Sequence, residues 1–184
     1  MRAAAEPAER HRAMEWTAVA AGLALLAGRA YAPLGAPVLA VIYLALVSLA
    51  VAPSPFGGTA RIHPLAVVGL GLAAVWTART VAGPAVPVAG VSTAAVALNT
   101  LAAVGEEAFF RRFMYDRLVR SGPFVAVAVC SLAFAAVHVP AYGWTAFPVD
   151  LGAGLLLGWQ RWASGTWLAP AVTHMFANIP VMFR

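Results

Sequence analysis

The stretch Gly105-Glu106-Glu107-Ala108-Phe109-Phe110-Arg111 places two adjacent carboxylates and a guanidinium in a chain that otherwise consists largely of alanine, valine and leucine. Only 10% of all residues are charged, whereas 62% are hydrophobic. Because a charge inside a membrane-type segment is costly, such charges mark functional positions by default. This stretch is therefore the first candidate for the functional centre of the protein.

The composition is that of a membrane protein. The chain has 184 residues and a mean hydropathy of +0.82, whereas soluble domains are only about half apolar. Apolar stretches of about 20 residues, long enough to cross a bilayer, recur along it. The fold class predicted from this pattern is all-α, a polytopic transmembrane bundle of about seven helices embedded in a lipid bilayer.

The charged residues and the cysteine content exclude several classes of protein. All 12 basic residues that produce the net charge of +5 are arginines, an excess that the positive-inside rule explains in a membrane protein. No aromatic residues are interleaved with a basic stripe, so no nucleic-acid partner is expected. The single cysteine, Cys130, excludes an internal disulfide framework and a cysteine-based zinc site.

Turn signals divide the chain into a polar N-terminal tail, residues 1–15, and one membrane-embedded domain, residues 16–184. The arginines of the tail predict a cytoplasmic N-terminus. The fifth helix is expected to stop at Pro140. The predicted helices are Trp16–Tyr31, Val38–Val51, Ile62–Val81, Val88–Arg120, Phe124–His138, Phe147–Arg161 and Thr166–Ile179.

Three short motifs carry polar groups in the second half of the chain. Residues four apart share one face of a helix, so Glu107 can pair with Arg111. Adjacent helical residues point about 100° apart, which predicts that Glu106 faces a different neighbour from Glu107. The motifs are Glu106-Glu107-x-x-x-Arg111, Phe134-x-x-x-His138 and His174-x-x-x-Asn178.

The turn at Gly122-Pro123 relates the first two motifs. Glu106 precedes Gly122 by 16 residues, and His138 follows it by 16. In an antiparallel hairpin both side chains would therefore lie at the same height, about 24 Å from the turn. A carboxylate opposite an imidazole can activate water, with the carboxylate as general base. His174 and Asn178 could then donate hydrogen bonds to a developing oxyanion, which predicts peptide hydrolysis inside the membrane.

Zinc chemistry is an alternative interpretation of the same residues. Glu106, His138 and His174 could instead be metal ligands, because zinc accepts two histidines and one glutamate with an open position. The sequence lacks a His-Glu-x-x-His helix, which would have favoured that interpretation. A metal-free site and a zinc site both remain open at this point.

The three motifs, in this order and on successive predicted helices, resemble the CPBP family of CAAX proteases and bacteriocin-processing enzymes, which are glutamic-type intramembrane endopeptidases. The resemblance extends over about residues 98–179, the catalytic core, and residues 154–178 are similar to the last two helices of the family. It implies an all-helical CAAX-type intramembrane protease without a required cofactor, and it also carries over the zinc alternative. The implied roles are water activation by Glu106 and His138, an oxyanion site at His174 and Asn178, and support from Glu107 and Arg111.

The resemblance implies a membrane-anchored protein or peptide as substrate, with prenylated tails, peptide precursors and sorting signals as the choices. The lysine-free, alanine- and arginine-rich composition is typical of a bacterium with a GC-rich genome. It favours maturation or sorting of exported proteins at the bacterial inner (plasma) membrane. With seven spans and a cytoplasmic N-terminus, Glu106 and His138 are expected in the outer half of the membrane.

Two further alternatives remain. Taken singly, His138 could be an interfacial histidine, and His174 with Asn178 could be an interhelical hydrogen-bonding pair. Separately, the chain could be a non-catalytic membrane immunity or scaffold protein that retains the fold. Asp150, near the start of the sixth predicted helix, could either complement the helix dipole or line the cavity.

Overall fold

A computed structural model describes residues 2–31, 34–54, 58–82 and 92–182. Every regular element among these residues is helical, which confirms the predicted all-α bundle. The long helices are α1 (Arg2–Gly28), α2 (Ala36–Ser48), α3 (Pro64–Ala82), α4 (Thr93–Glu107), α6 (Pro123–Tyr142), α7 (Phe147–Ser164) and α8 (Leu168–Met182).

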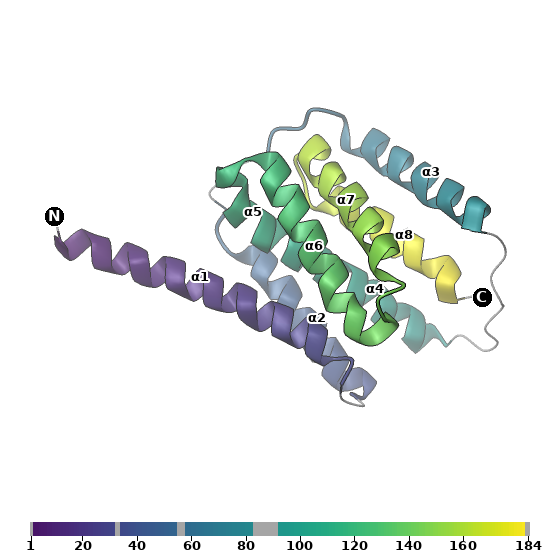
Figure 1. Ribbon diagram of the computed structural model, residues 1–184, viewed down its shortest axis with the longest axis horizontal. Helices are drawn as coiled ribbons and strands as arrows, with labels where there is room; N and C mark the ends of the chain where they lie inside the picture. The colour runs from purple at the N-terminus through teal and green to yellow at the C-terminus, as the bar shows by residue number, and fades with distance from the viewer. Residues whose placement is uncertain (1, 32–33, 55–57, 83–91, 183–184) are drawn as a thin grey trace.

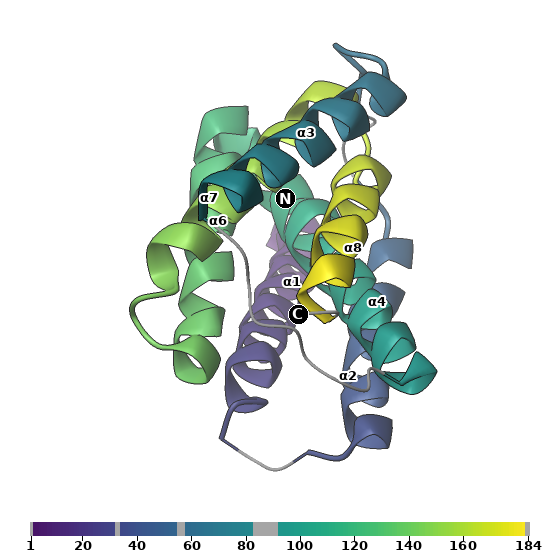
Figure 2. The ribbon, with the colours of Figure 1, turned by 90° about the vertical axis from the view of Figure 1, so that its right-hand side faces the viewer.

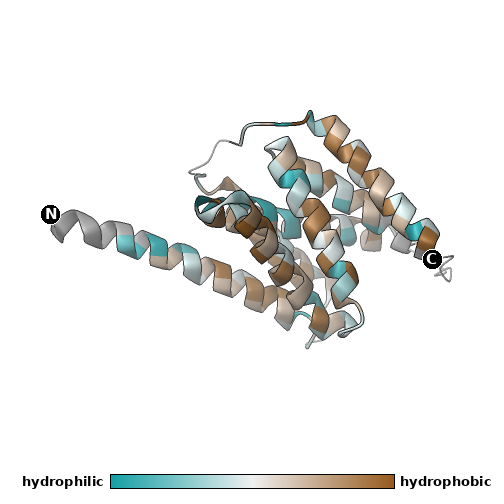
Figure 3. Ribbon diagram, turned by 45° about the horizontal axis from the view of Figure 1, so that its top comes forward, coloured by the Kyte–Doolittle hydropathy of each residue, from teal (hydrophilic) through white to brown (hydrophobic). Residues whose placement is uncertain are grey.

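Helix α1 joins the polar N-terminal residues and the first predicted span into one helix of 27 residues. Its N-terminal half projects from the bundle, whereas its C-terminal half packs against α6 (Figure 1). Hydrophilic residues gather on the projecting half, and hydrophobic residues predominate on the helices of the bundle (Figure 3). The apolar part of α1 is therefore the part that the bundle holds.

Two helices in the described part of the chain are both long and apolar enough to cross a membrane. They are α3, over Pro64–Val81, and α6, over Pro123–Tyr142. Helix α2 and the 3-10 turn after it form a shorter apolar segment, Ala36–Val51. Length and composition thus identify α3 and α6 as the clearest candidates for membrane-spanning helices.

The fourth predicted helix changes geometry directly after the two glutamates. Helix α4 ends at Glu107, and Ala108–Met114 form a π-helical segment that continues into the short helix α5 (Tyr115–Leu118). The chain then turns at Gly122, whose φ of +113° favours glycine. Because π-helical turns are rare and often occur at functional sites, this transition singles out the end of α4.

Helix α4 lies between α2 and α8, and α3 lies across α7 and α8 (Figure 2). Two glycines let helices approach closely. A Cβ on Gly105 would lie 3.0 Å from the carbonyl oxygen of Tyr43 in α2, and one on Gly154 would lie 3.0 Å from Cα of Ser131 in α6. Small residues at such crossings are typical of membrane bundles, and these two hold α2 and α7 close to the polar groups.

A cluster of phenylalanines packs the space between α1, the π-helical segment and α6. The Phe109 and Phe110 rings lie edge to face at 4.9 Å, and Phe110 contacts Phe134 in the same way at 5.5 Å. Phe109 packs against Gly22 of α1, where a Cβ would lie 2.3 Å from the ring. The cluster closes the site on its apolar side and fixes α1 against the bundle.

The sequence analysis predicted that helix α6 would stop at Pro140, but the helix continues past this residue. Pro140 lies inside the helix, which ends at Tyr142 and is followed by Gly143 with a φ of +80°. Proline removes one backbone donor, a small loss within the last turn. The prediction was wrong because this proline is close enough to the C-terminus of the helix to be tolerated.

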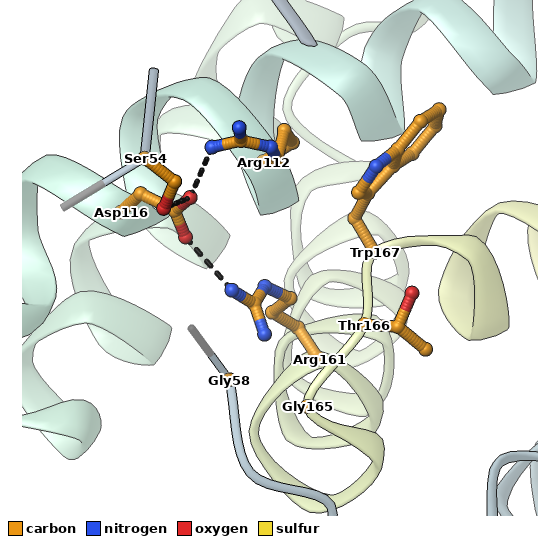
Figure 4. Close-up of a pocket in the computed structure, with 8 residues that line it drawn as sticks. All are labelled: Ser54, Gly58, Arg112, Asp116, Arg161, Gly165, Thr166 and Trp167. Carbon is orange, nitrogen blue, oxygen red and sulfur yellow. Dashed lines mark hydrogen bonds and ion pairs between the residues drawn. The ribbon is translucent and has the colours of Figure 1, made fainter. Parts of the chain in front are cut away.

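A buried ion cluster joins α5, α7 and the loop before α3 around Asp116 (Figure 4). The carboxylate accepts hydrogen bonds from Arg161 Nη2 at 2.8 Å and Ser54 Oγ at 2.5 Å, and it also pairs with Arg112. The cluster borders a polar cavity of about 190 Å³. Because Asp116 has three partners from three segments, we interpret the cluster as a structural link at the arginine-rich end of the bundle.

We expect Asp116→Asn to lower Tm by roughly 5–10 °C, because it leaves the buried guanidinium of Arg161 and the partly buried guanidinium of Arg112 without their carboxylate. The buried thiol of Cys130 provides the measurement, since a thiol-reactive dye labels it only after unfolding. Glu9→Gln, the same type of change at an exposed site, is the control and should leave Tm unchanged. Equal Tm values for both variants would contradict the structural role of the cluster.

Candidate active site

Glu106 is held near the end of α4 with only 4% of the residue exposed. Its Oε2 lies 3.6 Å from Nε2 of His138, and its Oε1 accepts a hydrogen bond from Arg29 Nη1 at 2.6 Å. The equal spacing of Glu106 and His138 from Gly122 thus places their side chains opposite one another, as the hairpin geometry predicts.

The partners of His138 determine which ring nitrogen carries the proton. Nδ1 lies 2.7 Å from the carbonyl oxygen of Phe134, which can only accept, so Nδ1 donates. Nε2 lies 3.2 Å from Arg29 Nη2, which can only donate, so Nε2 accepts. The four-residue spacing between Phe134 and His138 therefore fixes a neutral tautomer whose lone pair is directed at the site.

Arg29 and Tyr43 are site residues that sequence reasoning missed. Arg29 follows directly after α1, and its Nη1 also donates a hydrogen bond to the Tyr43 hydroxyl of α2 at 2.7 Å. The rarity of charge in an apolar chain, which singled out Arg111, applies equally to Arg29. No local spacing indicated its partner, because Glu106 is 77 residues away.

Glu107 faces a different side of α4 from Glu106 and is fully buried. Arg111 Nε lies 3.2 Å away, which confirms the predicted ion pair, although its angle does not make a hydrogen bond. Nδ1 of His174 in α8 lies 2.9 Å from Glu107 Oε1. The structure therefore joins His174 to Glu107, whereas the sequence interpretation had grouped it with Glu106.

This contact limits what His174 can do. If Nδ1–H donates to Glu107, Nε2 carries a second proton only in the imidazolium form. The predicted donation to an oxyanion through Nε2 thus requires a charged ring.

Asn178 lies one turn after His174 on the same face of α8, as predicted. Its Nδ2 donates a hydrogen bond to Oδ1 of Asn99 in α4 at 3.0 Å. Asn99 is a third residue that sequence analysis missed. Since an amide nitrogen has two hydrogens, this bond orients Asn178 and leaves it one further hydrogen to donate.

Asp150 lies in the first turn of α7, where it can both complement the helix dipole and face the site, so the two alternatives that the sequence left open are compatible. It interacts electrostatically with His138, Glu106 and His174, which places it on the site side of α7. Its Oδ2 is buried and has no hydrogen-bond partner among the described residues. Asp150 therefore adds a carboxylate to the lining of the site.

The zinc alternative does not fit this arrangement. Among the described residues no three His, Cys, Asp or Glu side chains are placed to hold one metal ion. His174 contacts Glu107, and the guanidinium of Arg29 contacts both Glu106 and His138. A fixed cation at this position would repel a divalent ion.

Comparison with known families agrees with this geometry. Residues 88–180 match the family model described as type II CAAX prenyl endopeptidase Rce1-like. The chain belongs to this family. It is thus an intramembrane protease, a hydrolase of the CPBP group, and an integral membrane protein.

Rce1-like proteases act on membrane-associated substrates. The matched region begins before α4 and extends through most of α8, so it contains all three motifs but neither Arg29 nor Tyr43. Searches of curated proteins and of solved structures return no significant match.

The Glu107–Arg111 pair can be tested with a double-mutant cycle. Arg111→Met and Glu107→Gln should each lower Tm, because each leaves a buried partner uncompensated, and the double variant should recover part of the loss. We expect a coupling free energy of about 1 kcal/mol or more. Labelling of Cys130 during heating provides the measurement.

Glu15→Gln combined with Arg111→Met is the matched control, because Glu15 contacts Arg117 rather than the Glu107 pair. Its effects should add to within about 0.5 kcal/mol. Additive losses for Glu107→Gln and Arg111→Met would show that the two side chains do not depend on each other.

Proposed function

We propose that Glu106 and His138 activate a water molecule that hydrolyses a peptide bond near the membrane-associated end of a protein or peptide substrate. The observation that carries this proposal is the buried Glu106–His138 pair, with 3.6 Å between Oε2 and Nε2. A water between them would donate one hydrogen to Oε2 and the other to Nε2, sharing the Nε2 lone pair with the longer 3.2 Å contact from Arg29 Nη2, and so would have two acceptors to orient it.

In the proposed reaction Glu106 takes one proton from the water while the water oxygen bonds to the substrate carbonyl carbon. The carbonyl oxygen becomes an oxyanion, which accepts hydrogen bonds from the His174 imidazolium and the second amide hydrogen of Asn178. The carbon–nitrogen bond then breaks, and Glu106 returns its proton to the leaving amine. Glu107 and Arg111 support this reaction by holding His174.

The proposed substrate is a membrane-anchored protein or peptide, and the proposed role is maturation or sorting of exported proteins. We place the protein in the bacterial inner membrane with a cytoplasmic N-terminus, which the arginines near that end support. Prenylated tails are the alternative substrate class, and the description of the matched family favours them.

Glu106→Gln should abolish hydrolysis while the protein stays folded, because the amide cannot accept the proton from water. His174→Ala should lower kcat by about 10²–10³-fold through loss of an oxyanion donor. Mass spectrometry of membrane-anchored proteins from cells with the wild type or each variant would detect the cleaved fragment. Full biological activity of Glu106→Gln would instead indicate a non-catalytic immunity or scaffold protein.

We further propose that hydrolysis needs no metal. Purified protein should keep its activity after treatment with a strong chelator, and elemental analysis should find no stoichiometric zinc. Loss of activity on chelation that added zinc restores would overturn this proposal and would leave the assignment of the chain as a protease intact.

A further inference from the structure

We propose that Arg29 is a positioning residue that holds the Glu106 carboxylate in its ionised form and aims it, with the His138 ring, at a shared water. This inference rests on the proposed function of Glu106. It concerns a residue outside the region that matches the family model, at the end of a helix that the three sequence motifs do not include.

The contacts of Arg29 use the fork geometry of a guanidinium. Nη1 donates to Glu106 Oε1 at 2.6 Å and to the Tyr43 hydroxyl at 2.7 Å, while Nη2 lies 3.2 Å from His138 Nε2. One planar group thus sets the distance between the carboxylate and the imidazole. A lysine has a single donor atom and could not reproduce both contacts.

The neighbouring carboxylates make a cation necessary to keep Glu106 ionised. Glu107 has its own cation, Arg111, and Asp150 adds a further carboxylate on the α7 side. Among the described residues, Arg29 is the arginine that pairs with Glu106. The titratable groups around Glu106 are Arg29 at the end of α1, Tyr43 of α2, Glu107 of α4, His138 of α6, Asp150 of α7 and His174 of α8.

Contacts other than those of Arg29 also hold helix α1 against the bundle. One of these contacts can therefore be removed as a matched control. Glu15 lies 14 residues before Arg29 and pairs with Arg117 Nη2 at 2.9 Å. Phe109 packs against Gly22, also in α1. Arg117→Met therefore removes a different ion pair that holds the same helix, without altering the charge next to Glu106. Any effect of Arg29→Met that Arg117→Met does not share reports on the site.

The test is an infrared titration of the full-length protein in lipid nanodiscs, read at the carboxylic-acid carbonyl band that Glu106→Gln removes. Without the guanidinium, Glu106 should take up its proton about one to three pH units higher in Arg29→Met than in the wild type. Arg117→Met should titrate as the wild type does. An unchanged midpoint in Arg29→Met would overturn the proposal.

Arg29→Lys separates charge from geometry and serves if Arg29→Met does not fold. It should keep the midpoint close to that of the wild type, yet release the cleaved fragment about tenfold or more slowly, since the two-point hold is lost. Wild-type activity of Arg29→Lys would overturn the positioning role. The two proposals can fail separately. If Glu106→Gln kept its activity while the midpoint of Arg29→Met was shifted, the proposed function would be refuted, but the role of Arg29 in holding Glu106 would be supported.

Discussion

Two adjacent carboxylates buried at the end of one helix impose the main constraint on this structure. A buried charge is tolerated only when it is paired, and neighbouring helical side chains diverge too widely to share one cation. Glu106 therefore needs partners on one side of α4 and Glu107 on the other. The structure supplies Arg29 with His138 for the first, and Arg111 with His174 for the second. The residue after α1, together with α6 and α8, thus brings these partners to the end of α4.

The change in helix geometry directly after Glu107 lies in an equally buried part of the chain. Phe109, Phe110 and Arg111 are all fully buried, although they are consecutive and a regular helix facing solvent would expose at least one of them. The π-helical segment lies where α1, α6 and α7 all contact the chain, so each side has a neighbour. Arg111 uses this position to donate a hydrogen bond to the carbonyl of Gly154 while its guanidinium lies over the Phe134 ring. The support of Glu107 is thus built into the packing of the bundle rather than added at its surface.

Spacing along the chain predicted the parts of the site that lie on one helix or on one hairpin. Glu107 with Arg111, His174 with Asn178, and Glu106 opposite His138 all follow from helical periodicity and a single turn. The partners contributed by distant segments could not be found in this way, because Arg29 is 109 residues from His138 and Asn99 is 79 residues from Asn178. Periodicity also assumes a regular helix, so it could not anticipate the π-helical segment. The continuation of α6 past Pro140 was also missed. The free-energy cost of a proline in a helix depends on its distance from the helix end, and the sequence did not show where α6 ends.

The two carboxylates differ in what they can still do. Glu107 has no exposed surface and contacts Arg111 on one side and His174 on the other, so water cannot reach it without breaking the bundle. Glu106 keeps a small exposed fraction, and its Oε2 faces a ring nitrogen whose lone pair the Phe134 carbonyl has left unprotonated. Of the two, Glu106 is the carboxylate with an oxygen that faces an acceptor nitrogen, the arrangement that the proposed water would use. This difference supports the proposal that Glu106 is the general base, whereas Glu107, whose Oε1 contacts His174, is suited to orienting that histidine.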